Sequence, residues 1–372
     1  MKILIVRPWP YELNLKGYNV QETGLARALV RRGHTCGIVL YRKKGKSYSE
    51  LLEEGIVVYH LRGFNILKNG IFIGLSKIAK KYDIIQTNEY DQIQSWMLYR
   101  KTGNGKKIVV YHGPYYDEFN KGYNLRCKLF DILFLSRSSR KLAGVVCMTK
   151  SPQAADFLKS KGFTNVRSVG VGIDPKPFEN VEIIDQRIRL PEKKKINILY
   201  VGKIEERRNI DFLLSLYEEL SLDDRFYFTI IGNGEKEYVS KMMPQIMELE
   251  KRGCLQYFEK ASQQELSKVY QASDIMLFPS NYDIFGMVLL EAMYFGCIVI
   301  SSNNGGSGTL ISSGDDGVIC NGFDKKEWIS HVHNIIADHD KMTAMKDKAS
   351  RKIREHYTWD KIAAEFESEY LK

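Results

Sequence analysis

Two carboxylates, Asp283 and Glu291, lie eight positions apart around the pair Phe285-Gly286. Glu291 falls in an otherwise apolar stretch that is predicted to be helical. Because burying an unpartnered carboxylate is costly, Glu291 is interpreted as a functional residue rather than a packing residue. A buried strand and a glycine loop are predicted to follow this helix. Loops at strand ends are where an open α/β sheet binds its ligand.

A second group with chemical potential is basic. Lys203 directly follows Gly202, at the end of the predicted strand Ile196–Val201, and Arg208 follows five positions later at a predicted helix start. Two cations at the end of one strand are suited to holding a phosphate group. For the neighbouring Arg207, a solvated position at a helix end is the favoured interpretation.

Together these residues resemble the donor-binding signature of the retaining glycosyltransferases of family 4, which have the GT-B fold. That signature is Glu-x7-Glu around Phe-Gly, then Leu-Glu-Ala-Met, Gly-x-x-Val-Ile-x-Ser and Gly-Gly. The chain matches it except that Asp283 replaces the first Glu. The family's Gly-Arg-Leu and Lys-Gly pieces correspond to Gly202-Lys203-Ile204 and Arg208-Asn209, so the two cations are exchanged in type.

The resemblance implies a role for each of these residues. Lys203 and Arg208 would hold the diphosphate of a nucleotide-sugar, and Glu291 would hold the ribose hydroxyls. Asp283 would contact the transferred sugar, with capping of a helix as the alternative. The amides at the start of the following helix would face the phosphate. The expected donor-binding set is Gly17, Gly202, Lys203, Arg208, Ile284, Phe285, Gly286, Met287 and Glu291.

In the N-terminal half, His112 ends a predicted buried strand in the sequence Tyr111-His112-Gly113. The resemblance makes it the family's His-Gly residue, close to the reacting sugar; a histidine that closes a loop is the alternative. The expected catalytic set is His112, Asp283, Lys203 and Arg208. Gly17 fits the second glycine of the family's N-terminal Gly-Gly loop, whereas Lys16 replaces the first.

Short β-branched runs alternate with longer amphipathic ones along the whole chain, which predicts an α/β fold with parallel sheets. Two Rossmann-like, doubly wound domains with a crevice between them are expected. The boundaries are an N-terminal acceptor domain at 1–175, a linker at 176–195 and a nucleotide-sugar donor domain at 196–356. A C-terminal helix at 357–372 is expected to pack back on the N-terminal domain. The predicted strands are Ile3–Val6, Thr35–Leu40, Val57–His60, Ile84–Thr87, Ile108–Tyr111, Gly144–Met148, Ile196–Val201, Phe226–Ile231, Leu255–Phe258, Asp274–Phe278, Cys297–Ser301 and Val318–Cys320.

The chain has 372 residues, a formal net charge of +10 and 44% hydrophobic residues. No apolar run approaches the ~20 residues that span a bilayer. The N-terminus is predicted to be a strand rather than a signal peptide. Six cysteines without paired spacing favour a reducing, cytoplasmic location. The positive charge favours phosphate or an anionic membrane, and no nucleic-acid-binding motif is present.

The segment Lys121–Lys141 combines six cations with seven large apolar residues. Such a helix either rests on an anionic membrane surface, at the inner face of the cell membrane, or packs within the N-terminal domain. Both alternatives stay open at the level of sequence.

The expected activity is retaining transfer of a sugar, most favourably from a UDP-sugar, to a hydroxyl of a glycan or lipid-linked glycan. The leaving diphosphate would help to deprotonate the acceptor. No cofactor and no metal are expected; the Asp338-His339-Asp340 run is interpreted as a helix cap, and Gly232-Asn233-Gly234 as a tight turn. The rival activities are another GT-B reaction, such as a disaccharide synthase or phosphorylase, and a non-catalytic partner subunit.

Overall fold

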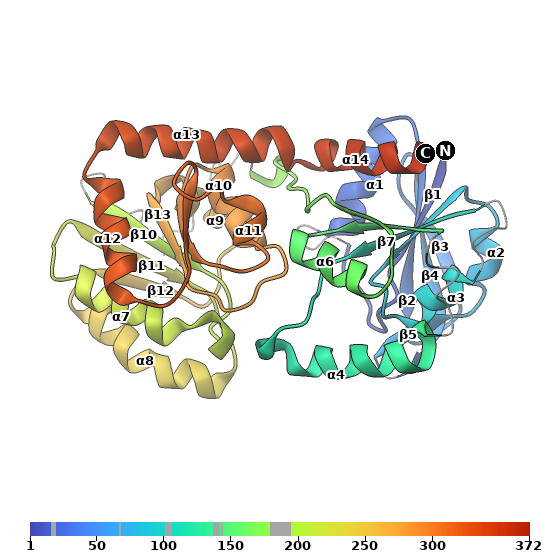
Figure 1. Cartoon of the computed structure of the whole chain (residues 1–372), viewed down its shortest axis with the longest axis horizontal. Coiled ribbons are helices and arrows are strands. Elements are labelled where there is room, and N and C mark those ends of the chain that lie inside the picture. The colour runs from blue at the N-terminus through green and yellow to red at the C-terminus, as the bar shows by residue number, and fades with distance from the viewer. Residues whose placement is uncertain (16–19, 67, 101–105, 137–141, 143, 179–194) are drawn as a thin grey trace. The chain divides into compact units, whose positions relative to one another are not determined.

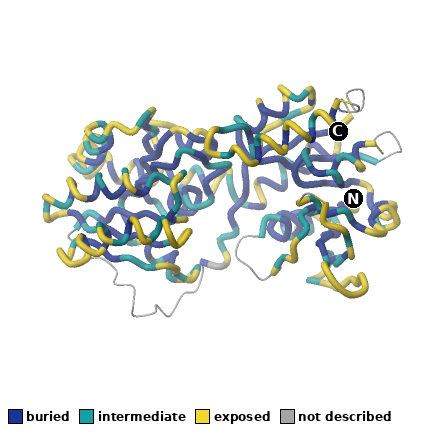
Figure 2. The backbone as a smooth tube through the Cα atoms, turned by 90° about the horizontal axis from the view of Figure 1, so that it is seen from below, coloured by how far each residue is buried: buried dark blue, intermediate teal, exposed yellow. Residues whose placement is uncertain are grey.

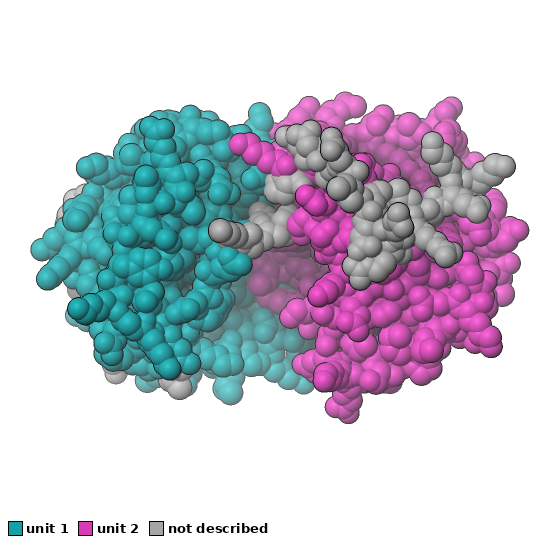
Figure 3. Space-filling view, turned by 180° about the vertical axis from the view of Figure 1, so that it is seen from behind, with its two compact units in different colours: residues 1–174, 357–372 teal, residues 175–356 magenta. Residues whose placement is uncertain are grey.

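The computed structural model describes the chain except for residues 16–19, 67, 101–105, 137–141, 143 and 179–194 (Figure 1). Gly17, Lys16 and most of the expected linker therefore lie outside the described residues. The chain divides into two compact units, which Figure 3 colours separately. Unit 1 is Met1–Asp174 with Tyr357–Lys372, and unit 2 is Pro175–His356.

Unit 1 is built on a sheet of nine described strands in the order β3-β4-β2-β1-β6-β7-β8-β9, with β5 paired to β4. The strands are parallel from β4 through β9, whereas β3 and β5 pair antiparallel with β4. Their bounds are β1 Lys2–Val6, β2 Thr35–Arg42, β3 Tyr48–Glu53, β4 Ile56–Ile66, β5 Asn69–Phe72, β6 Ile84–Asn88, β7 Lys107–His112, β8 Val145–Thr149 and β9 Asn165–Ser168.

The central strands β6 and β8 of this sheet are buried throughout, and β1 is buried apart from Lys2. Figure 2 shows the buried parts of the backbone in dark blue. The helical segments of unit 1 are α1 Gln21–Arg31, α2 Leu75–Ala79, α3 Ile93–Tyr99, the 3₁₀ turn η1 Glu118–Asn120, α4 Lys121–Phe130, the π-helical turn η2 Asp131–Leu135, α6 Pro152–Ser160 and α14 Trp359–Leu371.

The last helix, α14, packs against α1. A Cβ added to Gly24 of α1 would lie 2.3 Å from the Trp359 ring, and one added to Gly172 would lie 2.6 Å from it. Only glycine permits this close approach of the indole. The hydroxyl of Tyr370 also donates to Gln86 at 2.5 Å, which ties the end of the chain to the central sheet of unit 1.

Unit 2 contains six described strands, all parallel, in the order β12-β11-β10-β13-β14-β15. The strands are β10 Ile196–Val201, β11 Phe226–Ile231, β12 Leu255–Phe258, β13 Ile275–Phe278, β14 Ile298–Ser302 and β15 Gly317–Cys320. The helical segments are η3 Lys176–Phe178, η4 Glu206–Arg208, α7 Ile210–Leu220, α8 Lys236–Lys251, α9 Gln263–Ala272, α10 Met287–Tyr294, α11 Ser307–Leu310, α12 Lys325–Ile336 and α13 His339–His356.

The predicted α/β class and parallel strands are confirmed in both units. In unit 2, three predicted strands have the observed bounds and the others differ by one residue. Three strands of unit 1 were not predicted, namely β3, β5 and β9. Strands β3 and β9 lie at the edges of the sheet and are largely exposed, so they lack the apolar runs that mark buried parallel strands.

Every described helix is too short or too polar to span a lipid bilayer.

Candidate active site

The candidate site in unit 2 lies where the strand order of its sheet reverses. Strands β10 and β13 are neighbours there, although 73 residues lie between the end of β10 and the start of β13. The loops after such a pair of strands diverge and leave a crevice that binds ligands in doubly wound folds. The loop after β10 contributes Lys203 and Arg208, and the loop after β13 contributes Asp283.

Arg208 and Asp283 form a close ion pair. Nη1 of Arg208 lies 2.5 Å from Oδ2 of Asp283 and donates to the Ser280 hydroxyl at 2.9 Å. Both charged side chains are mostly buried. Burial by itself would lower the pKa of Arg208, but the negative charge of Asp283 raises it above its usual range. The guanidinium is therefore fixed in its charged form by a carboxylate from the neighbouring loop.

The other oxygen of Asp283 accepts two backbone hydrogen bonds, from the amide of Phe285 at 3.1 Å and from that of Gly286 at 2.7 Å. Asp283 thus closes the turn before α10. The N-cap position of α10 itself is Gly286, without a side-chain cap hydrogen bond, so Asp283 is not the helix N-cap that the alternative predicted. In this structure, these two amides donate to a carboxylate of the protein. The sequence assigns them to a phosphate, so that assignment requires Asp283 to give up both bonds.

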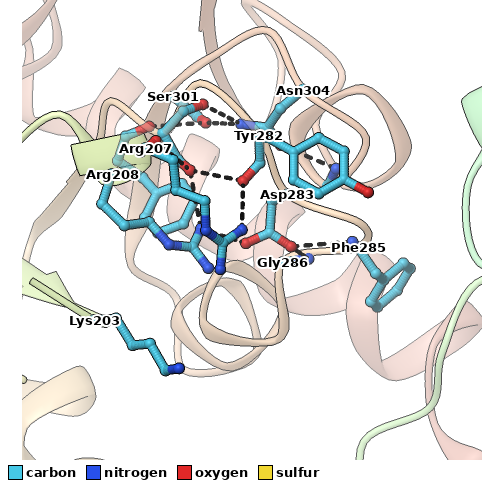
Figure 4. Close-up of polar contacts among 12 residues, drawn as sticks. Lys203, Arg207, Arg208, Tyr282, Asp283, Phe285, Gly286, Ser301 and Asn304 are labelled. Carbon is cyan, nitrogen blue, oxygen red and sulfur yellow. Dashed lines mark hydrogen bonds and ion pairs between the residues drawn. The ribbon is translucent and has the colours of Figure 1, made fainter. Parts of the chain in front are cut away.

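Figure 4 shows Asp283 between the guanidinium of Arg208 and the Phe285-Gly286 backbone. Arg207 points elsewhere: it pairs with Glu205 at 2.6 Å and donates to the Tyr282 carbonyl at 3.1 Å. Lys203 is exposed and extends away from this cluster (Figure 4), and its ammonium has no partner within the described part of the chain. The two cations predicted to act together therefore differ: Arg208 is paired with Asp283, whereas the ammonium of Lys203 has no partner among the described residues.

Two glycines allow close packing between loops that follow the strands of this sheet. A Cβ added to Gly306 would lie 2.7 Å from the Phe285 carbonyl oxygen, and one added to Gly232 would lie 1.7 Å from that of Gly202. Gly232 therefore allows the loops after β11 and β10 to approach each other, which a tight turn alone does not explain.

Asn304 organises the loop after β14. Its amide nitrogen donates to the carbonyls of Ser280 and Ser302, and its oxygen accepts from the amides of Gly306 and Ser307. Sequence reasoning placed base and sugar contacts near Asn303–Gly308 but gave the Asn304 side chain no role of its own, although an asparagine directly before Gly-Gly at a strand end is a signal for one.

Glu291 lies on α10 and is almost completely buried. One of its oxygens, Oε2, accepts a hydrogen bond from the Tyr270 hydroxyl at 3.0 Å. This partner is a tyrosine of α9. Ile284 and Met287 are half-buried at the same turn.

A separate polar cluster lies in unit 1 at the carboxyl ends of β6 and β7. His112 is fully buried, and its Nδ1 lies 2.6 Å from Oε2 of Glu89. Oε2 of Glu89 also accepts a hydrogen bond from the amide of Gly113 at 3.0 Å. Nζ of Lys150 lies 3.7 Å from the other carboxylate oxygen, Oε1. Burial would raise the pKa of Glu89, but His112 and Lys150 lower it below its ordinary value.

Glu89 was not identified from the sequence. It follows β6 directly and has a positive φ of 59°, a conformation that is uncommon for residues other than glycine. Its carboxylate faces Nδ1 of His112, although this close contact lacks the geometry of a hydrogen bond. Nε2 is buried without a hydrogen-bond partner among the described residues. The polar run Asn88-Glu89-Tyr90-Asp91 after a buried strand was the available signal.

Further acidic and amide oxygens lie in or next to this polar cluster. The side chains of Glu89, Asp91 and His112 approach one another within 4.8 Å, and Asn88 donates to Glu22 at 2.7 Å. Within the described residues, Oδ1 of Asp91, Oδ1 of Asn88 and Oε2 of Glu22 are buried without a donor. Burial raises the pKa of the Asp91 carboxyl to about 6.

Comparison with known families covers both units. Residues 17–176 match the description "Glycosyltransferase Family 4", and residues 181–352 match "Glycosyl transferases group 1". The chain belongs to the family 4 glycosyltransferases. An uncharacterized glycosyltransferase of Methanocaldococcus jannaschii, MJ1607, is 24% identical to this glycosyltransferase over 98% of the chain and 96% of its own length.

Solved structures show the same GT-B fold. The sucrose-phosphate synthase of Thermosynechococcus elongatus superposes with a TM-score of 0.71 at 16% identity, over 100% of this glycosyltransferase and 98% of that chain. The HepE protein of Anabaena in complex with UDP gives a TM-score of 0.70 at 14% identity, over 99% of both chains. At these identities the likeness concerns the fold alone.

Proposed function

We propose that this glycosyltransferase moves a sugar, with retention of anomeric configuration, from a UDP-sugar to a hydroxyl of a glycan or lipid-linked glycan. The observation that carries the proposal is the anion-binding arrangement around Asp283. One guanidinium nitrogen and two backbone amides converge on a single carboxylate at the switch point of the unit 2 sheet. A group that holds one anion in this way can hold a phosphate of similar size.

In the proposed complex, the diphosphate replaces Asp283 as the acceptor for Arg208 and the Phe285-Gly286 amides. Lys203, which has an unengaged ammonium among the described residues, adds the second cation. The leaving diphosphate gains negative charge as the glycosidic bond breaks, so these contacts strengthen in the transition state. Each charge-assisted contact is worth about 1.5–3 kcal/mol, or roughly one to two powers of ten in rate.

Asp283 has a second role in this proposal. Once released from the amides, its carboxylate accepts a hydrogen bond from a hydroxyl of the transferred sugar. Glu291 binds the ribose hydroxyls of the nucleotide while Tyr270 keeps its carboxylate oriented. Gly202, Ile284 and Met287 contribute backbone surface next to the diphosphate.

In unit 1, His112 is proposed to contact the transferred sugar through Nε2. Glu89 holds the ring on its other side. The buried oxygens without donors at Glu22, Asn88 and Asp91 support an acceptor that is rich in hydroxyl groups, because hydroxyls supply the missing donors.

The proposed reaction uses no enzyme nucleophile, and the leaving diphosphate takes the proton of the acceptor hydroxyl. The protein's own cations neutralise the diphosphate, so no metal or other cofactor is assigned. A cytoplasmic location, where nucleotide-sugars are made, or the inner face of the membrane suits this reaction.

The deciding experiment is titration calorimetry of the folded protein with UDP, GDP, ADP and the corresponding nucleotide-hexoses. Binding of a uridine nucleotide in the micromolar to millimolar range supports the proposal. Absence of heat with all of them, on protein with a cooperative thermal transition, overturns it. Product analysis with the bound donor then distinguishes glycan transfer from a phosphorylase reaction, which would consume inorganic phosphate, and from a non-catalytic protein, which would release no nucleotide.

A further inference from the structure

The helical segment α4–η2 of unit 1 has a buried apolar face and an exposed apolar face. Tyr123, Cys127 and Phe130 are buried against the rest of the unit. Four other apolar residues of the same segment are exposed: Leu125 by 72%, Leu129 by 49%, Ile132 by 69% and Leu133 by 43%. The helix is therefore packed in the domain, as one alternative predicted, and it also keeps a second apolar face outside.

These four exposed residues, called here the apolar stripe, lie on one side of the helix. At about 100° per residue, Leu125 and Leu129 are neighbours on one face, and Ile132 and Leu133 continue that face by one more turn. Exposed apolar residues scattered singly need no explanation, but a contiguous row on one helix face marks an interaction surface.

Cations border the stripe on both sides. Lys121 and Lys128 lie along one edge and Arg126 along the other, and all three are exposed. Within residues 121–136 the single acid is Asp131, which pairs with Lys161 at 2.6 Å and accepts from Tyr90. The stripe is thus bordered by three exposed cations, in a chain whose net charge is +10.

An aromatic pair lies at the end of this segment. The Trp96 and Phe134 rings are 5.1 Å apart, and Trp96 donates its indole N–H to the Phe134 carbonyl. Arg100 lies over the Trp96 ring at 5.2 Å. Tryptophan next to arginine is typical of side chains placed at the level of lipid headgroups.

We propose that the apolar stripe of α4–η2 and its bordering cations dock this protein on the surface of an anionic phospholipid bilayer. The leucine and isoleucine side chains enter the acyl boundary, while Lys121, Arg126 and Lys128 contact lipid phosphates. A second copy of the chain is a poorer occupant. A stable dimer usually buries about 800 Å² on each partner, more than these four partly exposed side chains supply.

The docking surface is connected to the polar cluster of unit 1 through the buried side of the same helix. The Phe130 ring is 5.9 Å from Tyr90, whose ring is 5.2 Å from that of His112. A single helix layer and one tyrosine thus separate the proposed lipid contact from His112. This arrangement favours an acceptor that is anchored in the same membrane, a step that rests on the proposed function, whereas docking itself does not.

Vesicle co-sedimentation tests the docking. The full chain is mixed with vesicles of phosphatidylcholine alone, or of phosphatidylcholine with phosphatidylglycerol. The wild type is expected to sediment with the anionic vesicles only. The double variant Leu125→Ser/Ile132→Ser and the variant Lys121→Glu/Lys128→Glu are each expected to lower partitioning at least about tenfold. Leu222→Ser, at a more exposed leucine of unit 2, is the matched control and should partition as the wild type does.

Thermal unfolding and UDP calorimetry on the same preparations separate the possible failures. Wild-type protein that stays in the supernatant with both vesicle types overturns the docking, whether or not it binds UDP. A wild-type dimer that the stripe variant converts to monomer, with no vesicle binding, assigns the stripe to a second copy instead. Vesicle binding without any nucleotide binding keeps the docking and removes the proposed function.

Discussion

The guanidinium of Arg208 and the carboxylate of Asp283 lie 2.5 Å apart, on loops that follow adjacent strands of one parallel sheet. The two residues are 75 positions apart in the chain. Asp283 also accepts hydrogen bonds from two backbone amides, so its carboxylate holds together the groups that are proposed to bind phosphate. A diphosphate that binds there must therefore replace the carboxylate of Asp283 as the partner of Arg208 and of the two amides.

Replacing Lys203 by Ala should lower the transfer rate at least about tenfold and leave the melting temperature unchanged. The reason is that its ammonium is exposed and has no partner among the described residues, so it contributes to substrate binding rather than to the stability of the fold. Lys236→Ala, at another exposed lysine of unit 2, is the matched control. Wild-type rates for Lys203→Ala would remove this residue from the phosphate site.

Arg208→Ala should lower both the transfer rate and the stability. It removes a phosphate contact and also leaves the mostly buried Asp283 without its cation, which costs roughly 1–3 kcal/mol. Arg208→Lys should recover part of the stability but less of the rate, since a lysine cannot reproduce the planar guanidinium geometry. Rates and denaturant midpoints, with the exposed Arg225→Ala as control, measure the two effects. A loss of stability with normal turnover would make Arg208 purely structural.

Asp283→Asn should bind UDP more tightly than the wild type and turn over at least about tenfold more slowly. The amide side chain still reaches the Phe285 and Gly286 amides through its oxygen, but it no longer competes as a charge for Arg208. Calorimetry gives the affinity, and initial rates give the turnover. Weaker UDP binding than in the wild type would contradict the exchange of anions.

Glu89→Gln should leave UDP affinity unchanged and reduce the turnover number. Its carboxylate lies 2.6 Å from Nδ1 of His112 and holds the ring in place, and a neutral amide would weaken this contact. A positioning role predicts a shift in the pH dependence of the turnover number, whereas a merely structural role predicts only a lower melting temperature. Glu118→Gln, at an exposed glutamate of the same unit, is the control.

Asp91→Asn should raise the melting temperature at about pH 7 and have no effect at about pH 4. Burial raises the pKa of Asp91 from 3.8 to about 6, so the folded state holds its proton longer than the unfolded chain does. The folded state therefore loses stability as the pH rises through this window, and the uncharged Asn avoids the loss. Calorimetric scans across the range test this; a variant that is less stable at about pH 7 would contradict it.

Much of the architecture follows from the sequence alone. The buried parallel strands of unit 2 are short, contiguous apolar runs, and such runs mark strand positions without knowledge of the fold. Lys203, Arg208, Asp283 and Glu291 could be selected because charged residues directly after such strands, or within an apolar helix, have few structural uses. The exposed edge strands β3 and β9 lack that signal and were missed.

The tertiary structure alone decided which groups meet. Asp283 and the two amides after it were each visible in the sequence, but their mutual hydrogen bonds depend on a turn whose shape Gly286 and Gly306 permit. Glu89 reaches His112 because parallel pairing places the ends of β6 and β7 side by side. The apolar stripe exists because α4 buries only one of its two apolar faces. Hydrophobic periodicity shows that a side chain is apolar and at which turn it lies, whereas its partner is set by long-range packing that a linear pattern does not contain.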